Sequence, residues 1–301
     1  DERGLRRDTL QCNSFDLTVA GWANAPDVDF RGADENPSIM GEFVWTGFDY
    51  LGEPTPYYEE WPSRSSYFGI VDLCGIPKDR YYLYQSKWAQ KEPLHLLPHW
   101  TWPGREGQAI SVHCYSAWNV VELFVNGKSQ GKHAKSGKNI QNRYRLVWNA
   151  VVYEPGELKA VAYDSKGKAV KDTVVRTAGG PAKVTLTPDG ETVMQADGDD
   201  MAFAMVSIMD EGGNVCPQAD HQVEFKVEGP AEIAAVDNGN AASVESFQAH
   251  HRKAFHGKCM VYLRSLAGQA GRITLTATAD GPVAIETGPD VSTPPLEAGQ
   301  R

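Results

Sequence analysis

The spacing of apolar residues changes along the chain and marks distinct regions. Residues 1–40 mix polar, glycine and proline residues with short apolar pieces, a pattern that predicts a long loop and no helix. Residues 42–46 form a short apolar run and predict a buried strand. Residues 79–91 read as a helix with Asp79 as its N-cap. One loop, one strand and one helix cannot close a domain by themselves.

A period of two takes over from about residue 93. Residues 110–115 alternate, and residues 121–125 do the same before Asn126-Gly127, a dipeptide typical of a two-residue hairpin turn. Another strand is expected at residues 144–148, where Tyr144, Leu146 and Trp148 would lie on the same face. Strands at roughly ten-residue spacing with such turns predict an antiparallel sandwich of immunoglobulin type over residues 93–178.

A second all-β region follows a hinge at residues 177–181. Its three cleanly alternating stretches are residues 201–209, 223–227 and 273–277. They predict a second β-sandwich over residues 179–282. Residues 283–301 are rich in Pro, Gly, Thr and Glu, a composition that favours a tail or linker.

The composition is that of a soluble globular protein, with 41% hydrophobic and 23% charged residues among 301. No apolar run approaches the roughly 18 to 20 residues of a membrane span, so no membrane partner is expected. The net charge of −10 divides into −7 for residues 1–92, +6 for 93–178 and −9 for 179–301. The lysines of the basic middle lie around turns without interleaved aromatics, which argues against nucleic acid and favours docking on acidic neighbours.

Five cysteines without a C-x-x-C pair indicate buried free thiols and exclude a zinc knuckle. His250 and His251 are adjacent and would face opposite sides of a strand. Residues 197–200 resemble part of a calcium loop but lack the acidic ligand at the twelfth position, so a solvated turn is expected. The sequence therefore predicts no metal and no cofactor.

Residues 41–57 place an apolar run directly before an aromatic, acidic and proline-rich loop. Sugars offer apolar C–H faces that stack on indole rings and hydroxyls that donate to carboxylates, so Trp45 beside Asp49 and Glu53 is typical of a sugar site. A core tryptophan beside a solvated acidic loop is the alternative. Glu42 has the opposite strand parity to Trp45, which predicts that it faces surrounding helices and is structural.

The same stretch resembles the last barrel strand of glycoside hydrolase family 2, the β-galactosidase and β-glucuronidase family. Further matches, to the barrel's final loop and helix and to the sandwich that follows it in many β-galactosidases, are residues 65–72, 77–86, 99–104 and 121–128. The likeness covers nearly the whole chain and thins after about residue 280. It implies a mainly β fold class: a C-terminal segment of a catalytic (β/α)8 barrel over residues 1–92, followed by two immunoglobulin-like β-sandwich domains.

The resemblance implies part of a retaining exo-glycosidase that hydrolyses terminal β-galactosides through a covalent galactosyl intermediate. Such enzymes need two carboxyl groups about 5 to 5.5 Å apart. The family takes both from earlier barrel strands that have no match here, so the chain alone is expected to lack them. The remainder of the barrel would come from the same gene or another chain.

By the same resemblance, Trp45 forms the wall of the glycone pocket, and Asp49 and Glu53 bind hydroxyls rather than attack carbon. Trp100 and Trp102 share one parity, and they either project toward a sugar or pack the domain junction.

Substrate choice rests on Phe68. Glucuronidases of the family bind the sugar carboxylate with an Asn-x-Lys-Gly tract, and the aligned residues here are Ser66-Tyr67-Phe68-Gly69. An apolar Phe68 cannot neutralise a carboxylate, which favours a neutral sugar such as galactose. The resemblance also implies a periplasmic or extracellular location. Two alternatives stay open: a non-catalytic carbohydrate-binding or spacer sandwich module, and sandwiches that only set a homo-oligomer.

Overall fold

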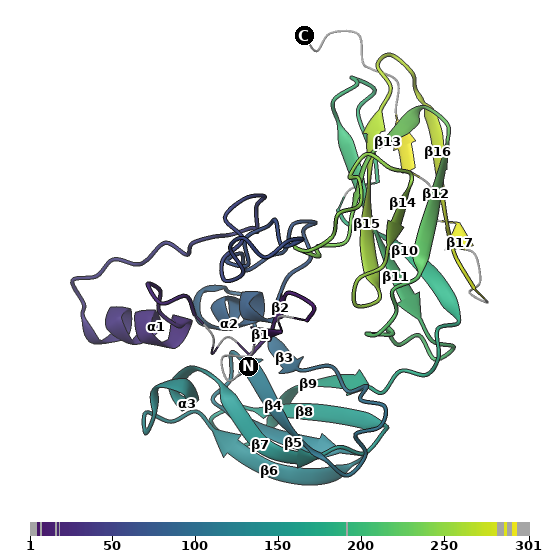
Figure 1. The fold of residues 1–301 in the computed structure, drawn as a ribbon. Coiled ribbons are helices and arrows are strands. Elements are labelled where there is room, and N and C mark those ends of the chain that lie inside the picture. The colour runs from purple at the N-terminus through teal and green to yellow at the C-terminus, as the bar shows by residue number, and fades with distance from the viewer. Residues whose placement is uncertain are drawn as a thin grey trace. The chain divides into compact units, whose positions relative to one another are not determined.

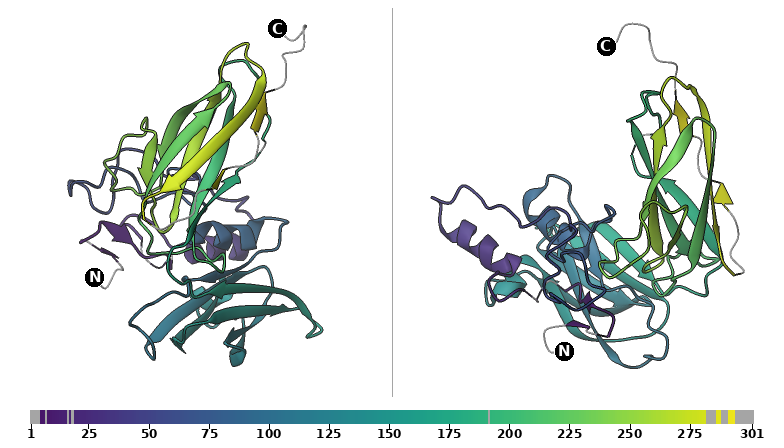
Figure 2. Two further views of the ribbon diagram at one scale, coloured as in Figure 1. Left: turned by 90° about the vertical axis from the view of Figure 1, so that its right-hand side faces the viewer. Right: turned by 45° about the horizontal axis from the view of Figure 1, so that its top comes forward.

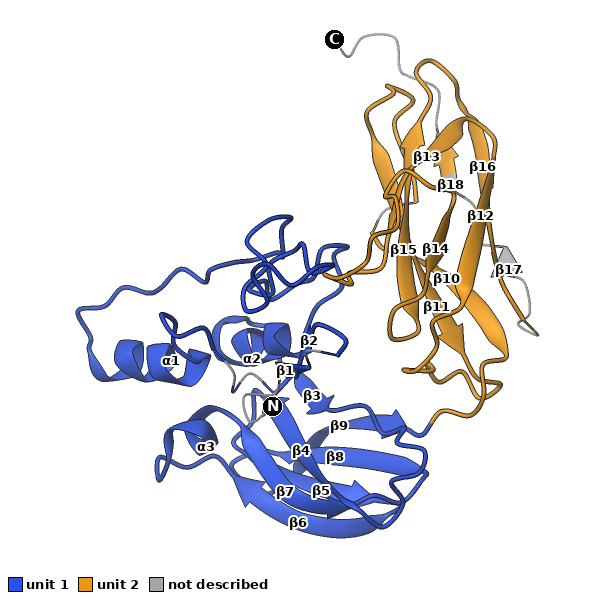
Figure 3. Cartoon of the chain, in the orientation of Figure 1, with its two compact units in different colours: residues 1–177 blue, residues 178–301 orange. Residues whose placement is uncertain are grey.

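The chain divides between Thr177 and Ala178 into two units (Figure 3). The structure is a computed structural model, and it describes residues 5–6, 8–15, 17, 19–190, 192–281, 286–287 and 291–293. No helix in this part of the chain is long and apolar enough to cross a membrane. Antiparallel strands dominate both units, so the mainly β fold class is confirmed. The barrel origin of residues 1–92 stays a prediction.

The first unit carries three helices and nine strands among its described residues (Figure 1). In chain order they are β1 Leu5–Arg6, β2 Gln11–Cys12, α1 Pro26–Glu35, α2 Asp79–Trp88, β3 Leu94–Leu97, β4 Ala109–Ser116, β5 Val120–Val125, β6 Lys128–Ala134, α3 Ile140–Tyr144, β7 Leu146–Val152, β8 Glu157–Tyr163 and β9 Ala169–Arg176. Two antiparallel sheets, β3-β4-β7 and β6-β5-β8-β9, make the predicted sandwich. One face of each contributes to a shared apolar core.

The predicted hairpin at Asn126-Gly127 is confirmed. Both residues have positive φ, 48° and 78°, as the tight turn between β5 and β6 requires. The strand predicted to include Tyr144 begins only at Leu146, so the prediction is wrong for Tyr144. Leu146 and Trp148 lie in β7 and in the sandwich core, whereas Tyr144 ends the short helix α3 and packs with Phe30 instead.

Helix α1 is the main element that the sequence pattern missed. Pro26 occupies its first turn together with Asp27 and Asp29, which suits the positive end of a helix dipole. Its apolar residues at positions 26, 30 and 33 follow helical spacing, but Phe30 is the only large side chain among them, so the helix depends on tertiary contacts. Phe30 is 1% exposed and packs edge-on against Tyr84 of α2.

The predicted strand at residues 42–46 is also wrong. The backbone pairs only from Thr46 onward, where Ile70 donates to the Thr46 carbonyl (3.1 Å) and Asp49 donates to the Val71 carbonyl (3.0 Å). A strand requires a hydrogen-bonded neighbour, and residues 41–45 have no paired strand beside them. Phe43 and Trp45 are consequently exposed rather than buried.

Helix α2 confirms the predicted helix, but it ends at Trp88 rather than at residue 91, and its cap differs. Lys78 is the N-cap residue, and Asp79 is the first helical residue. The Asp79 carboxylate instead lies 2.6 Å from the imidazole Nε2 of His95 in β3. The helix is therefore joined to the sandwich through its first turn.

Three consecutive residues at the end of α3 also tie α1 to the sandwich. Arg143 pairs with Glu35, and the Tyr144 hydroxyl donates to Asp34 at 2.8 Å. Arg145, which is fully buried, pairs with Asp27 at the other end of α1. The first unit thus joins residues of the predicted barrel segment and of the first sandwich in one compact body.

The second unit is the predicted second sandwich, seen from two further sides in Figure 2. Its strands are β10 Lys183–Pro188, β11 Met201–Met209, β12 Gln222–Glu228, β13 Ala231–Asp237, β14 His251–Lys253, β15 Lys258–Ser265, β16 Gly271–Ala279, β17 Glu286–Thr287 and β18 Val291–Thr293. They form the sheets β10-β11-β15-β13 and β14-β12-β16-β17, with β18 on β16. Aliphatic residues from both sheets fill the space between them.

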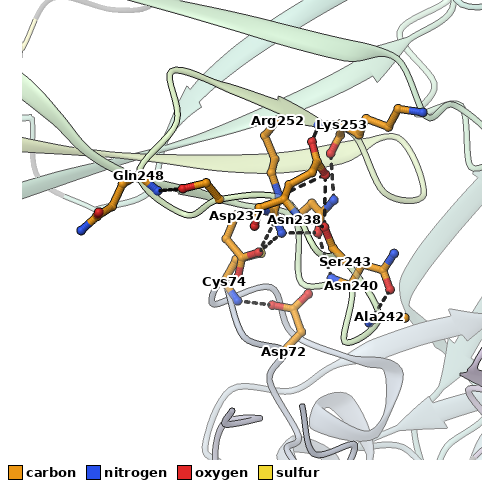
Figure 4. A network of polar contacts seen from close by, with 12 residues as sticks. Asp72, Cys74, Asp237, Asn238, Asn240, Ala242, Ser243, Gln248, Arg252 and Lys253 are labelled. Atoms are coloured by element: carbon orange, nitrogen blue, oxygen red, sulfur yellow. Dashed lines mark hydrogen bonds and ion pairs between the residues drawn. The ribbon is translucent and has the colours of Figure 1, made fainter. Parts of the chain in front are cut away.

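Arg252 of β14 organises a buried polar network in this unit (Figure 4). Its guanidinium lies 2.7 Å from Asp237 and 3.1 Å from the Asn238 amide oxygen, and it also donates to the Glu245 carbonyl. Asn238 in turn donates to the Lys253 carbonyl at 2.9 Å. The network fixes the long connection between β13 and β14.

The predicted tail is wrong at two short segments. Residues 286–287 pair with β16, as do residues 291–293, and Ser292 also exchanges backbone hydrogen bonds with Thr192 and Met194. The other residues of the predicted tail lie outside the described part of the chain.

Candidate functional site

Trp45, Tyr50 and Glu53 form a hydrogen-bonded chain in the loop that follows α1. The Trp45 side chain is 69% exposed, and its indole Nε1 lies 3.1 Å from the Tyr50 hydroxyl. The Tyr50 hydroxyl donates to the Glu53 carboxylate. Two of the residues predicted for the sugar site are therefore brought together by a third that was not predicted.

The chemistry of these groups fixes the direction of the hydrogen bonds. Indole is a donor only, and an ionised carboxylate is an acceptor only, so the Tyr50 hydroxyl must accept from Trp45 and donate to Glu53. The hydrogen bond to Glu53 is the main cause that raises the pKa of Tyr50, which keeps the phenol protonated. The exposed indole is thus held by its polar edge, and its ring faces remain available for stacking.

Two further rings extend the aromatic surface beside Tyr50. The Phe68 ring lies 6.5 Å from the Tyr50 ring, and the Trp22 ring lies 5.4 Å from Phe68 in an edge-on arrangement. Trp22 is itself 63% exposed. Phe68 was singled out in the sequence as the residue that favours a neutral sugar, and these contacts give it an uncharged aromatic environment.

Asp49 occupies a different environment from Trp45 and Glu53. It is buried, one oxygen accepts from the Gly69 backbone at 2.8 Å, and the other forms an ion pair with Lys78. Burial is the largest influence on its pKa and raises it, although Lys78 opposes this. Both oxygens of Asp49 are thus already engaged within the protein. Its contact with a sugar stays a prediction.

Gly69 allows the Asp49 segment and residues 69–71 to approach closely. A Cβ at position 69 would lie 2.2 Å from the Asp49 nitrogen and 2.4 Å from the Val71 carbonyl oxygen. No side chain fits at such distances, so only glycine permits this pairing. The close approach sets where the chain turns toward Tyr50 and Glu53.

Trp100 and Trp102 belong to the first sandwich. Trp100 is fully buried in its core, and its indole donates to the Glu154 carbonyl at 3.0 Å. Trp102 packs at the edge of that core, stacks on His99 and lies under the Arg105 guanidinium. The described contacts of Trp102 share no residue with those of Trp45, and its predicted contact with a sugar stays untested.

Glu42 has the environment expected of a structural residue. Partial burial raises its pKa, and the charged groups that influence this pKa are Asp29 of α1, which raises it, and Lys87 of α2, which lowers it. The carboxylate therefore faces the helices. Its Oε1 atom is buried without a hydrogen-bond partner among the described residues.

No sequence pattern singled out Tyr50 as part of the site, or Trp22 as the neighbour of Phe68. Tyr50 lies in the aromatic, acidic loop already noted, but its role depends on which hydroxyl faces the indole. Trp22 lies in a turn, where the Ala23 nitrogen donates to the Ala20 carbonyl, far along the chain from Trp45. Its place next to Phe68 arises only from folding.

Possible metal ligands do not gather anywhere in the described residues: no group of three or more His, Cys, Asp or Glu side chains could hold an ion. Asp197 instead accepts backbone hydrogen bonds from Asp199 and Asp200, as in a solvated turn. All five cysteines are free thiols, and four of them are buried.

Comparison of the chain with known proteins points to one family. The family described as glycoside hydrolase family 2 C-terminal domain 5 matches residues 184–284, and a domain of unknown function matches residues 107–171. A β-galactosidase of Bacteroides ovatus, BoGH2A, is 47% identical over 93% of the chain. A putative β-glucuronidase of Formosa agariphila is 34% identical over 84% of it.

A crystal structure of a β-glycosidase from Bacteroides vulgatus superposes with a TM-score of 0.84 at 35% identity. The superposition covers 95% of this chain and 34% of the Bacteroides vulgatus chain. The chain belongs to glycoside hydrolase family 2. It spans about a third of the first of these curated relatives (32%) and about a quarter of the second (24%).

Proposed function

We propose that this chain is part of a retaining exo-glycosidase that removes terminal β-galactosyl residues from oligo- or polysaccharides. In this proposal residues of the first unit form one wall of the donor-sugar site, and the two sandwiches are accessory domains. The observation that carries the proposal is an indole, Trp45, that is exposed at 69% yet tethered by its nitrogen to Tyr50.

The tethered indole suits a sugar for two reasons. Its face can stack on the apolar C–H side of a pyranose ring, and stacking on a held ring costs little conformational entropy. Glu53 lies next to it and accepts from Tyr50 through one oxygen, Oε2, so Oε1 can accept from a sugar hydroxyl. A combined stacking and hydrogen-bonding surface is what a carbohydrate site requires.

The aromatic surroundings support a neutral sugar. Phe68 contacts Trp22 and Tyr50, which carry no charge, and Lys78, which donates to the Tyr67 carbonyl, already pairs with Asp49. A sugar carboxylate buried there would compete with Asp49 for that cation, at a cost of several kcal/mol. The curated relatives include both β-galactosidases and β-glucuronidases, and the 47% identical one is named a β-galactosidase. We therefore favour galactose over glucuronic acid.

The two catalytic carboxyl groups are proposed to lie outside this chain. Asp49 is paired with Lys78, and Glu53 binds Tyr50, which suits positioning rather than attack on carbon. The isolated chain should then show no turnover of an aryl β-galactoside. Turnover that disappears in Glu53→Gln or Asp49→Asn would contradict this part of the proposal.

The deciding experiment uses the complete enzyme that contains this chain, assayed on an aryl β-galactoside and the matching aryl β-glucuronide. We expect activity on the galactoside and a loss of about 10- to 100-fold in kcat/KM for Trp45→Ala. Trp102→Ala is the matched control and should change kcat/KM by less than about threefold. Preference for the glucuronide, or equal losses in the two variants, would refute the proposal.

The alternative of a non-catalytic glycan-binding sandwich makes a different prediction. It requires polysaccharide binding that depends on Trp102 and is indifferent to Trp45, so the same pair of variants separates the two functions in a binding assay. A periplasmic or extracellular location is proposed with the family resemblance, and fractionation of the source cells tests it.

A further inference from the structure

We infer that Trp22 forms a second sugar subsite, which binds the sugar unit next to the terminal galactose. This inference rests on the proposed function. Four aromatic rings from three separate segments make a continuous strip, in the order Trp22, Phe68, Tyr50 and Trp45, of which the last two lie in the same loop. The first three are joined by ring contacts of 5.4 and 6.5 Å, and the last two by the indole hydrogen bond of 3.1 Å.

The exposure of the four rings gives the strip two ends. Trp22 and Trp45 are exposed at 63% and 69%, whereas Phe68 and Tyr50 between them are half-buried. Each of the two ring-to-ring steps, 5.4 and 6.5 Å, is comparable to the width of a pyranose ring. Two exposed indoles at the ends of a supported strip suit two consecutive sugar units.

The polar groups distinguish the two ends. Glu53 and the Tyr50 hydroxyl lie at the Trp45 end, where they can define the hydroxyls of the terminal sugar. At the other end Trp22 contacts the apolar Phe68 in an edge-on arrangement. That end therefore offers stacking with little hydroxyl selection, which suits an aglycone sugar whose identity can vary.

Trp22 is held well enough to act as a platform. It lies in a turn closed by the hydrogen bond from the Ala23 nitrogen to the Ala20 carbonyl at 2.9 Å, and its ring rests on Phe68. Trp61 offers a contrast in the same unit: it is 74% exposed but has no described ring contact. The ring chain, and not exposure alone, distinguishes Trp22.

The test compares methyl β-galactoside, which has one sugar, with a β-galactosyl disaccharide in the complete enzyme. Trp22→Ala should lower kcat/KM for the disaccharide about tenfold and leave that for the methyl galactoside within about twofold. Trp22→Tyr should restore most of the loss, because it restores a stacking ring. Trp61→Ala, the matched control, should change neither substrate.

Other outcomes would overturn the subsite. Equal losses on both substrates would mean that Trp22 supports the fold or packs against another part of the enzyme. No loss on the disaccharide would mean that the ring touches no sugar. A wild-type enzyme inactive on both substrates would refute the proposed function itself, and with it this subsite, whereas either of the first two results in an active enzyme refutes the subsite alone.

Discussion

Arg145 and Asp27 form a fully buried ion pair, although 118 residues separate them in the sequence. The Arg145 guanidinium also donates to the Phe15 carbonyl at 2.8 Å and to the Tyr115 hydroxyl at 3.3 Å. One side chain of the sandwich therefore holds α1 and the segment before it. Because the Trp45 loop follows α1, the first sandwich contributes to the placement of the candidate site.

Removing one partner of this pair should be strongly destabilising. Arg145→Met leaves the Asp27 carboxylate buried without its cation, and we expect the free energy of unfolding of the first unit to fall by about 3–5 kcal/mol. All eight tryptophans lie in this unit, so tryptophan fluorescence during urea unfolding reports on it alone. Arg176→Met, which removes an exposed partner of Glu157, should cost less than about 1 kcal/mol. Equal effects would contradict the assignment.

His113 should make the stability of the first unit pH-dependent. Burial, and then the nearby Arg145, lower its pKa to about 4, against about 6.5 in an unfolded chain. Between these values the unfolded state binds a proton that the folded state does not. The free energy of unfolding should therefore fall as the pH drops from about 6.5 to about 4, by up to about 3 kcal/mol.

The measurement compares wild type with His113→Gln in urea at several pH values. Burial raises the pKa of Asp49 and Asp72, so these carboxylates act in the opposite direction and are present in both proteins. The difference between the two proteins isolates the histidine. A difference that does not change with pH would show that His113 is not responsible.

Gly69 should tolerate no side chain. In Gly69→Ala the new Cβ would meet backbone atoms of Phe48, Asp49 and Val71 at 2.2–2.5 Å, and backbone cannot move aside as a flexible side chain can. We expect a loss of at least about 3 kcal/mol in unfolding free energy, or displacement of the Asp49–Lys78 pair. Gly47→Ala is the control, because nothing lies within 4 Å of a Cβ there. Its stability should stay within about 1 kcal/mol of wild type.

Tyr50→Phe should weaken sugar binding by the complete enzyme without unfolding it. The change removes only the hydroxyl that joins Trp45 to Glu53, and a hydrogen bond to a charged group contributes about 1.5–3 kcal/mol. We expect KM for a β-galactoside to rise about tenfold and kcat to fall by less.

Tyr163→Phe provides a matched control for that variant. Tyr163 also donates to a carboxylate, Glu122, at 2.8 Å on the surface of the first sandwich. It should leave KM and kcat unchanged. A KM that rises equally in both variants, or in neither, would remove Tyr50 from the site.

Local patterns were sufficient for most of the sandwich strands. Residues such as Val121 and Leu123 alternate because one face of each sheet is buried, and Asn126-Gly127 specifies its own turn by accepting positive φ. The aromatic and acidic character of residues 41–57 is also a local property. Both the mainly β fold and the region of the candidate site could therefore be read directly from the order of residues.

The misplaced elements are those whose stability comes from distant residues. Helix α1 has only one large apolar side chain at helical spacing, Phe30, and depends on its packing with Tyr84 and on the Arg145–Asp27 pair. Residues 42–45 have strand composition but no hydrogen-bonded strand beside them, so Phe43 and Trp45 are exposed while Val44 packs against the core. No local pattern encodes either kind of contact.

The chain by itself determined which residue types suit a sugar site, but only folding decided which of them lie together. Sequence proximity grouped Trp45, Asp49 and Glu53, whereas the structure separates Asp49 into a buried pair with Lys78 and joins Trp45 to Glu53 through Tyr50. Trp22 enters the strip through Phe68, 46 positions further along the chain. The physical reason is that side-chain direction and burial depend on contacts between distant segments, which composition and spacing do not record.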